Sequence, residues 1–171
     1  MLLLSCAQFS LAQEQYRGLP YPPNEIFEAM LSYAEDGGFQ GLTASLAYVR
    51  PLSEVLNREF KVDAEAGIRD AIAAKSPAEA RKAVLRLIYL DLRLNIRTAG
   101  ETEDAARREE AVQLAFLDYG FLSREIKAKD RLLDQEIKRC FRKLYRCRKR
   151  SEARGLCEDL LRRLASVLED S

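Results

Sequence analysis

The chain has 171 residues, of which 47% are hydrophobic and 32% are charged, with 8 glycines and 5 prolines. This length suits a single domain with its own hydrophobic core, and the composition is typical of helices with one solvated face. Because the sequence contains no histidine, Ser-His-Asp, Cys-His and histidine–metal chemistry are excluded. We therefore predict a non-enzymatic protein without a cofactor.

The N-terminal residues 1–12 are apolar or small, and Ser10 and Ala12 have the side-chain size that a signal peptidase accepts before its cleavage point. Cleavage after Ala12 predicts a periplasmic or secreted protein. The stretch that ends at Cys6 also resembles a lipoprotein cleavage box. The alternative is a docked apolar N-terminus of a cytoplasmic protein. Elsewhere the chain has no run of the ~20 apolar residues that a membrane span needs.

After an extended, proline-rich linker at 13–23, residues 24–171 are predicted to form one domain. The apolar spacing indicates an all-α fold, an antiparallel helical bundle of about six helices with the later ones long. Asn24 is expected to cap the first helix, which ends at Gly37, and Pro51 is expected to bend or interrupt the second.

The later helix starts are marked by polar residues. Asp63 is expected to cap a short third helix, and Ser76, Pro77 and Glu79 form a capping-box signature for the most apolar helix, which should end before Gly100. Thr102 with the acids Glu103 and Asp104 is expected to start the next helix. Whether 104–149 is one helix or two stays open, with Gly120 and the Lys129–Asp130 step as candidate breaks.

Three cysteines lie in the C-terminal third of the chain. Cys140 and Cys147 are seven residues apart, roughly 10 Å along a helix, which is too far for a disulfide. If the chain turns near 150–154, Cys147 and Cys157 lie symmetrically about that turn and are the disulfide candidate. The alternative is that these cysteines are small apolar core residues.

Residues 138–154 contain nine basic residues and one acid, Glu152, so the rest of the chain carries −7 although the whole chain carries +1. Cations in this segment interleave with Phe141 and Tyr145 and predict binding of nucleic acid or an anionic membrane surface. The candidate residues are Lys138, Arg139, Arg142, Lys143, Arg146, Arg148, Lys149 and Arg150. The alternative is a solvated helix face, partly neutralised by Glu103, Glu109 and Glu110.

Carboxylates provide a third candidate site, with oxygen ligands for a hard cation or ferric iron. Glu25 and Glu28 lie one turn apart, and Asp91 lies in the most apolar helix, where Asp118 or Tyr119 could approach it. The structural alternative is that acids favour a first helical turn and that a buried arginine pairs with Asp91. No metal ligand is assigned.

A helical pattern runs through the second half of the chain: Ala115, Phe116, Tyr119, Leu122, Ile126, Asp130, Leu133, Ile137 and Phe141. It resembles the secreted helical modules that accompany bacterial iron permeases, which are similar to imelysin-like bundles. The resemblance implies a periplasmic bundle linked to metal uptake. The chain departs from it by lacking histidine and an Arg-Glu-x-x-Glu motif, since Asn24 precedes Glu25.

The function we predict from these observations is an exported helical bundle that acts by binding an unidentified protein partner. The alternatives are a polyanion-binding module that uses the basic segment and an oxygen-ligand metal-binding accessory of iron uptake. A homodimer is also consistent with the coiled-coil spacing of the last helix, at Cys157, Leu160, Leu164 and Val167.

Overall fold

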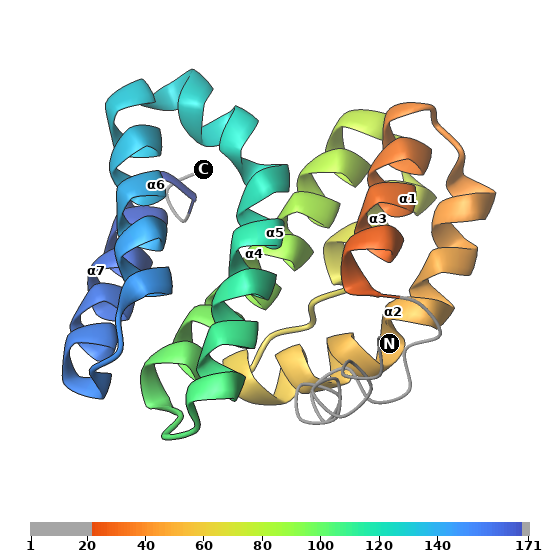
Figure 1. The fold of residues 1–171 in the computed structure, drawn as a ribbon. Helices are drawn as coiled ribbons and strands as arrows, with labels where there is room; N and C mark the ends of the chain where they lie inside the picture. The colour runs from red at the N-terminus through yellow and green to blue at the C-terminus, as the bar shows by residue number, and fades with distance from the viewer. Residues whose placement is uncertain (1–21, 169–171) are drawn as a thin grey trace, which may run out of the picture. The chain divides into compact units, whose positions relative to one another are not determined.

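The computed structural model describes residues 22–168, which form helices and no strand (Figure 1). The helices are α1 (Pro23–Glu35), α2 (Phe39–Phe60), α3 (Ala66–Ala73), α4 (Pro77–Glu101), α5 (Ala105–Lys129), α6 (Arg131–Arg146) and α7 (Arg150–Leu168). The all-α prediction is confirmed for these residues, and the antiparallel bundle arrangement stays a prediction. Within 22–168 no helix is long and apolar enough to cross a membrane.

The described chain forms two compact units, one up to Leu90 and one from Asp91 onward, and α4 continues from the first into the second. In the first unit α2 packs against both α1 and α3. Its fully buried side chains include Phe27, Met30, Leu42, Leu52, Leu56, Ile68, Leu87 and Ile88.

In the second unit α6 packs against α5 and α7, and α5 also contacts α7. The core consists of the stripes that recur every three or four residues along these helices and along the end of α4. Its buried residues include Leu92, Ile96, Val112, Ala115, Tyr119, Leu122, Ile126, Ile137, Phe141, Leu144, Cys157, Leu160 and Leu164. This unit contains the basic segment.

Side-chain caps set three of the helix starts. Ser76 accepts a hydrogen bond from the Glu79 amide at 3.4 Å, as the capping signature predicted. Asp104 accepts from the Ala106 amide at 2.8 Å and Asp130 from the Leu132 amide at 2.9 Å. The 104–149 region is therefore two helices, because Asp130 has an extended backbone and caps the second of them.

Several predicted boundaries were wrong. Asn24 does not cap α1, because the helix already begins at Pro23 with Pro22 as its N-cap. Proline in a first turn has no amide that needs a capping acceptor. The N-cap of α3 is Glu65, and Asp63 instead accepts from the Glu65 amide at 3.1 Å. The helix α4 runs through Gly100 to Glu101.

Pro51 does not interrupt α2, which is one helix from Phe39 to Phe60, but the helix bends along its length (Figure 1). A proline inside a helix costs about 3 kcal/mol. Buried apolar residues on both sides of it, Leu46 and Val49 before and Leu52 and Leu56 after, pack both halves of the helix against the core and offset that cost.

The predicted leader at 1–12 and most of the predicted linker at 13–23 lie outside the described residues. The single domain predicted for 24–171 also stays a prediction.

Candidate polyanion-binding site

Helix α6 carries cations on one side and apolar residues on the other. Arg139, Arg142, Lys143 and Arg146 are exposed, and their spacing of three and four residues places them along one stripe. The buried residues of the helix lie on the opposite side: Asp134, Ile137, Cys140, Phe141 and Leu144. Because this buried side packs against α5 and α7, the cations are left facing solvent.

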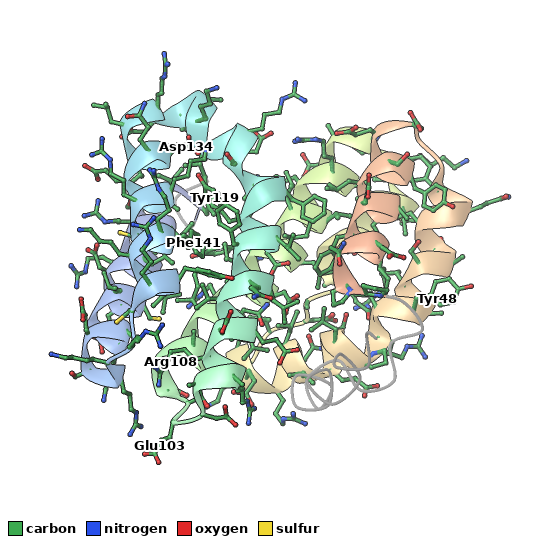
Figure 2. The ribbon with its side chains drawn as sticks, in the orientation of Figure 1. Tyr48, Glu103, Arg108, Tyr119, Asp134 and Phe141 are labelled. Carbon is green, nitrogen blue, oxygen red and sulfur yellow. The ribbon has the colours of Figure 1, made fainter. Side chains whose placement is uncertain are left out.

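The start of α6 is attached to α5 through the buried carboxylate of Asp134 (Figure 2). It accepts hydrogen bonds from the Tyr119 hydroxyl, from Ser123 at 3.0 Å and from Lys138 at 2.8 Å. Burial alone would raise the pKa of Asp134, but these hydrogen bonds lower it below the usual value. Lys138, one of the eight candidate cations, is thus already paired with a carboxylate inside the protein.

An aromatic cluster adds apolar contact at the same place, where Figure 2 shows Tyr119 and Phe141 close together. The Phe141 ring lies 5.4 Å from both the Tyr119 and the Phe116 ring centroids. Phe141 is 3% exposed, so it belongs to the core and is not available to stack on a nucleobase. Aromatic pairs of this kind add ~0.5–1.5 kcal/mol beyond their buried area.

Arg150 is the second candidate cation that binds a partner inside the protein. Its guanidinium lies 2.5 Å from the carboxylate of Glu103 and donates to the Glu101 carbonyl at 3.1 Å. This pair connects the start of α7 to the connection between α4 and α5. Glu103 is therefore one of the acidic neighbours that neutralise a cation of the segment, as expected. Glu109 instead accepts a 3.4 Å hydrogen bond from the uncharged Tyr145 hydroxyl.

The other six candidate cations are exposed and form no ion pair with any residue of 22–168. We call them the basic face: Arg139, Arg142, Lys143, Arg146, Arg148 and Lys149. Within residues 22–168, the only hydrogen bond of their side chains is a 3.3 Å bond that Arg142 donates to the Lys138 carbonyl. Their charges are therefore available to an external anion.

The last four of these cations surround a shallow cavity of about 420 Å³ between the end of α6 and the start of α7. We call it the corner cavity. It is lined by Lys143, Arg146, Cys147, Arg148, Lys149 and Glu152. The connection between the two helices is only three residues long, 147–149, and this brings cations from the end of α6 and from the connection around one space, with Glu152 as the residue from α7.

The cysteines Cys140, Cys147 and Cys157 are free thiols in the structure. Burial raises the pKa of all three, and that of Cys157 reaches about 12. Charge on Cys147 also acts on Cys157, so the two candidate partners are neighbours, while the disulfide itself stays a prediction. Thiols with raised pKa are weak nucleophiles at neutral pH.

Arg108 was not singled out from the sequence, although it occupies an apolar-stripe position with Ala111, Val112 and Ala115. It is 7% exposed, and its Nε has no hydrogen-bond partner. One terminal nitrogen donates to the Thr102 carbonyl at 3.4 Å. Its charge lowers the pKa of both Cys147 and Cys157, against the larger effect of burial.

Asp118 lies near enough to Asp91 for the charge of Asp91 to act on it. Both carboxylates are buried, and Asn95 donates to Asp118 at 3.0 Å. Burial and the charge of Asp91 raise the pKa of Asp118 well above its usual value. Glu25 and Glu28 are exposed on the first turns of α1.

A cation would need more oxygen ligands than this pair supplies. In the described chain no three acidic or cysteine side chains come together in a way that could hold a metal ion.

Comparison with protein-family models, with curated proteins and with solved structures found no match. The resemblance to modules that accompany iron permeases and to imelysin-like bundles therefore stays a prediction from the sequence.

Proposed function

We propose that this protein binds phosphate-bearing polyanions through its basic face. One observation carries the proposal: six exposed cations lie on one side of α6 and around its C-terminal end, without an ion pair inside the described chain. The two candidate cations with a structural partner, Lys138 and Arg150, are excluded from the binding surface.

The arrangement of these cations is not explained by the stability of α6. Arg139 and Lys143 are four residues apart, as are Arg142 and Arg146, and like charges at this spacing destabilise a helix by about 0.2–0.5 kcal/mol per pair. The negative end of the helix dipole favours cations in the last turn, which includes Lys143 and Arg146. It does not account for Arg139 or Arg142, which lie further from that end.

Binding of this kind releases counterions, so its strength falls as salt rises. If all six cations contact phosphates of duplex DNA, the logarithm of the binding constant falls with the logarithm of salt concentration with a slope of about −5. The other polyanion considered, an anionic membrane surface, would also show salt-sensitive binding.

The test is fluorescence anisotropy of a labelled DNA duplex over a range of salt concentrations. A triple variant with Arg139→Gln, Arg142→Gln and Arg146→Gln should bind more weakly. The slope of its salt dependence should be less negative by about 3. The control replaces three exposed cations elsewhere on the same unit, Arg124, Lys127 and Arg131, by glutamine. Absence of binding at low salt, or an equal loss in the control, would overturn the proposal.

Export, binding of a protein partner and a role in metal uptake remain separate proposals supported by the sequence alone. The apolar residues 1–12 support export to the periplasm or the cell exterior. The mass of the intact protein recovered from its host tests it: a chain that starts at Gln13 supports export, and one that starts at Met1 contradicts it.

A further inference from the structure

We infer that the corner cavity binds the terminal phosphate monoester of a nucleic acid strand, while the remainder of the basic face follows the adjoining phosphodiesters. This inference rests on the proposed polyanion binding and adds to it the chemical group that the cavity selects.

The lining of the corner cavity is strongly positive. Four cations and one carboxylate line the cavity, Lys143, Arg146, Arg148 and Lys149 with Glu152, so its lining carries a net charge of +3. A phosphodiester carries one negative charge, whereas a phosphate monoester carries about −1.5 to −2 near neutral pH and presents three acceptor oxygens. A concave site with several cations around one space therefore favours the monoester.

The cavity also lies at the start of α7, a helix of 19 residues. As in any α-helix, the first amide N–H groups have no acceptor within the helix, and they add a partial positive charge at this end. Glu152 belongs to this first turn and also lines the cavity. The thiol of Cys147, which also lines the cavity, donates a hydrogen bond to the Lys149 carbonyl at 3.3 Å.

The surroundings of the cavity favour nucleic acid over a lipid surface. The apolar side of α6 is buried in the core, and Leu132, which is 72% exposed, lies about 21 Å along the helix from Arg146. The exposed Tyr145 is hydrogen-bonded through its hydroxyl to Glu109 and Gln113 on α5. Among residues 22–168, no large apolar side chain lines the cavity, so the lining offers none to enter a bilayer.

The stripe of cations along α6 leads toward the corner cavity. Arg139 and Arg142 lie on the same side of α6 as Lys143 and Arg146, and the stripe from Arg139 to Arg146 extends about 10 Å along the helix axis before it reaches the cavity. A strand that starts with its terminal phosphate in the cavity can place its next phosphates along these cations.

The experiment compares three forms of one internally labelled oligonucleotide with the full chain, by anisotropy at fixed salt. One form has a 5′-phosphate, one a 3′-phosphate and one hydroxyls at both ends. We expect one phosphorylated form to bind at least about tenfold more tightly than the hydroxyl form at pH 7.5. The preference should shrink at pH 5, below the second pKa of a phosphate monoester, which is about 6.

Two double variants separate the cavity from the stripe. Arg148→Gln with Lys149→Gln should abolish the preference for the terminal phosphate. Arg139→Gln with Arg142→Gln should weaken all three oligonucleotides by the same factor and keep the preference. Glu152→Gln should increase it, because the one carboxylate of the lining is removed.

The outcomes separate the two proposals. Binding of none of the oligonucleotides would overturn the proposed function and the inference together. Equal binding of the three forms would overturn the inference alone. Vesicles that contain phosphatidic acid, a lipid monoester, provide the last arm: binding to them more tightly than to the phosphorylated oligonucleotides would assign the cavity to a lipid headgroup and overturn the nucleic acid assignment.

Discussion

The hydroxyl of Tyr119 on α5 donates a hydrogen bond to the carboxylate of Asp134 on α6, and both side chains are buried. This bond attaches the helix that carries the basic face to the rest of its unit. The same carboxylate accepts from Lys138, so one buried acid is shared between a core tyrosine and a partly exposed cation.

Tyr119→Phe should lower the free energy of unfolding by about 1.5–3 kcal/mol, because a hydrogen bond to a charged acceptor is lost inside the core. Urea denaturation at pH 7 measures this. Ser123→Ala, which removes a 3.0 Å bond to the same carboxylate from a less buried position, should cost less, about 0.5–1.5 kcal/mol. A Tyr119→Phe variant as stable as the parent would show that the bond does not stabilise the unit.

Asp118→Asn should stabilise the protein increasingly as pH rises. Burial and the charge of Asp91 raise the pKa of Asp118 above 3.8, so the folded state holds its proton more tightly than the unfolded state does. This contribution to stability is present at acid pH and is lost as pH rises through the raised pKa. Urea denaturation of parent and variant between pH 4 and pH 8 measures the difference.

Asp134→Asn is the matched control, because its effect on stability should change with pH in the opposite direction. Its carboxyl has a lowered pKa, so its stabilising effect is present above 3.8 and is lost as pH falls through the folded-state pKa. A stability difference for Asp118→Asn that stays constant with pH, or that grows toward acid pH, would contradict the assignment.

Arg108→Met should leave stability unchanged or raise it by up to about 2 kcal/mol. The buried guanidinium has an Nε without a partner and only a 3.4 Å hydrogen bond to Thr102, and an unsatisfied buried polar group costs about 1–3 kcal/mol. Methionine keeps the length of the side chain without the charge. The exposed neighbour variant Arg107→Met should stay within about 0.5 kcal/mol of the parent; a large loss at Arg108 would show that the guanidinium has a partner in solution.

Cys147 should react with an aromatic disulfide reagent at pH 8 at least about tenfold faster than Cys140 and Cys157, since reaction requires an accessible thiolate. Cys147 is partly exposed, whereas Cys157 is 3% exposed with a pKa of about 12. The measurement uses a Cys6→Ser background and single cysteine variants. Equal rates for Cys147 and Cys157 would contradict the packing of α7.

The predicted disulfide can be checked with the same protein. Mild oxidation followed by intact mass should show the loss of two hydrogens, and the loss should disappear in Cys147→Ser if Cys147 and Cys157 are the pair. Closing so short a loop should stabilise the folded state by roughly 2–3 kcal/mol.

The sequence by itself determined the features that depend on contacts between near neighbours. The all-α class follows from apolar spacing, and Ser76 caps α4 by bonding to the amide three residues further on, as its capping signature predicted. The caps at Asp104 and Asp130 are equally local, but the sequence left open whether Asp130 separates two helices. The cationic stripe from Arg139 to Arg146 is likewise a consequence of helical periodicity, since residues three and four apart share one face.

Only the tertiary structure decided which of those cations remain unpaired. Arg150 meets Glu103 from 47 residues away, and the hydroxyl of Tyr119 donates from another helix to Asp134, the partner of Lys138. The corner cavity exists because a three-residue connection brings the end of α6 to the start of α7. Such long-range pairs depend on how helices pack, and packing is selected by the total burial of apolar surface, which no local stretch of sequence encodes.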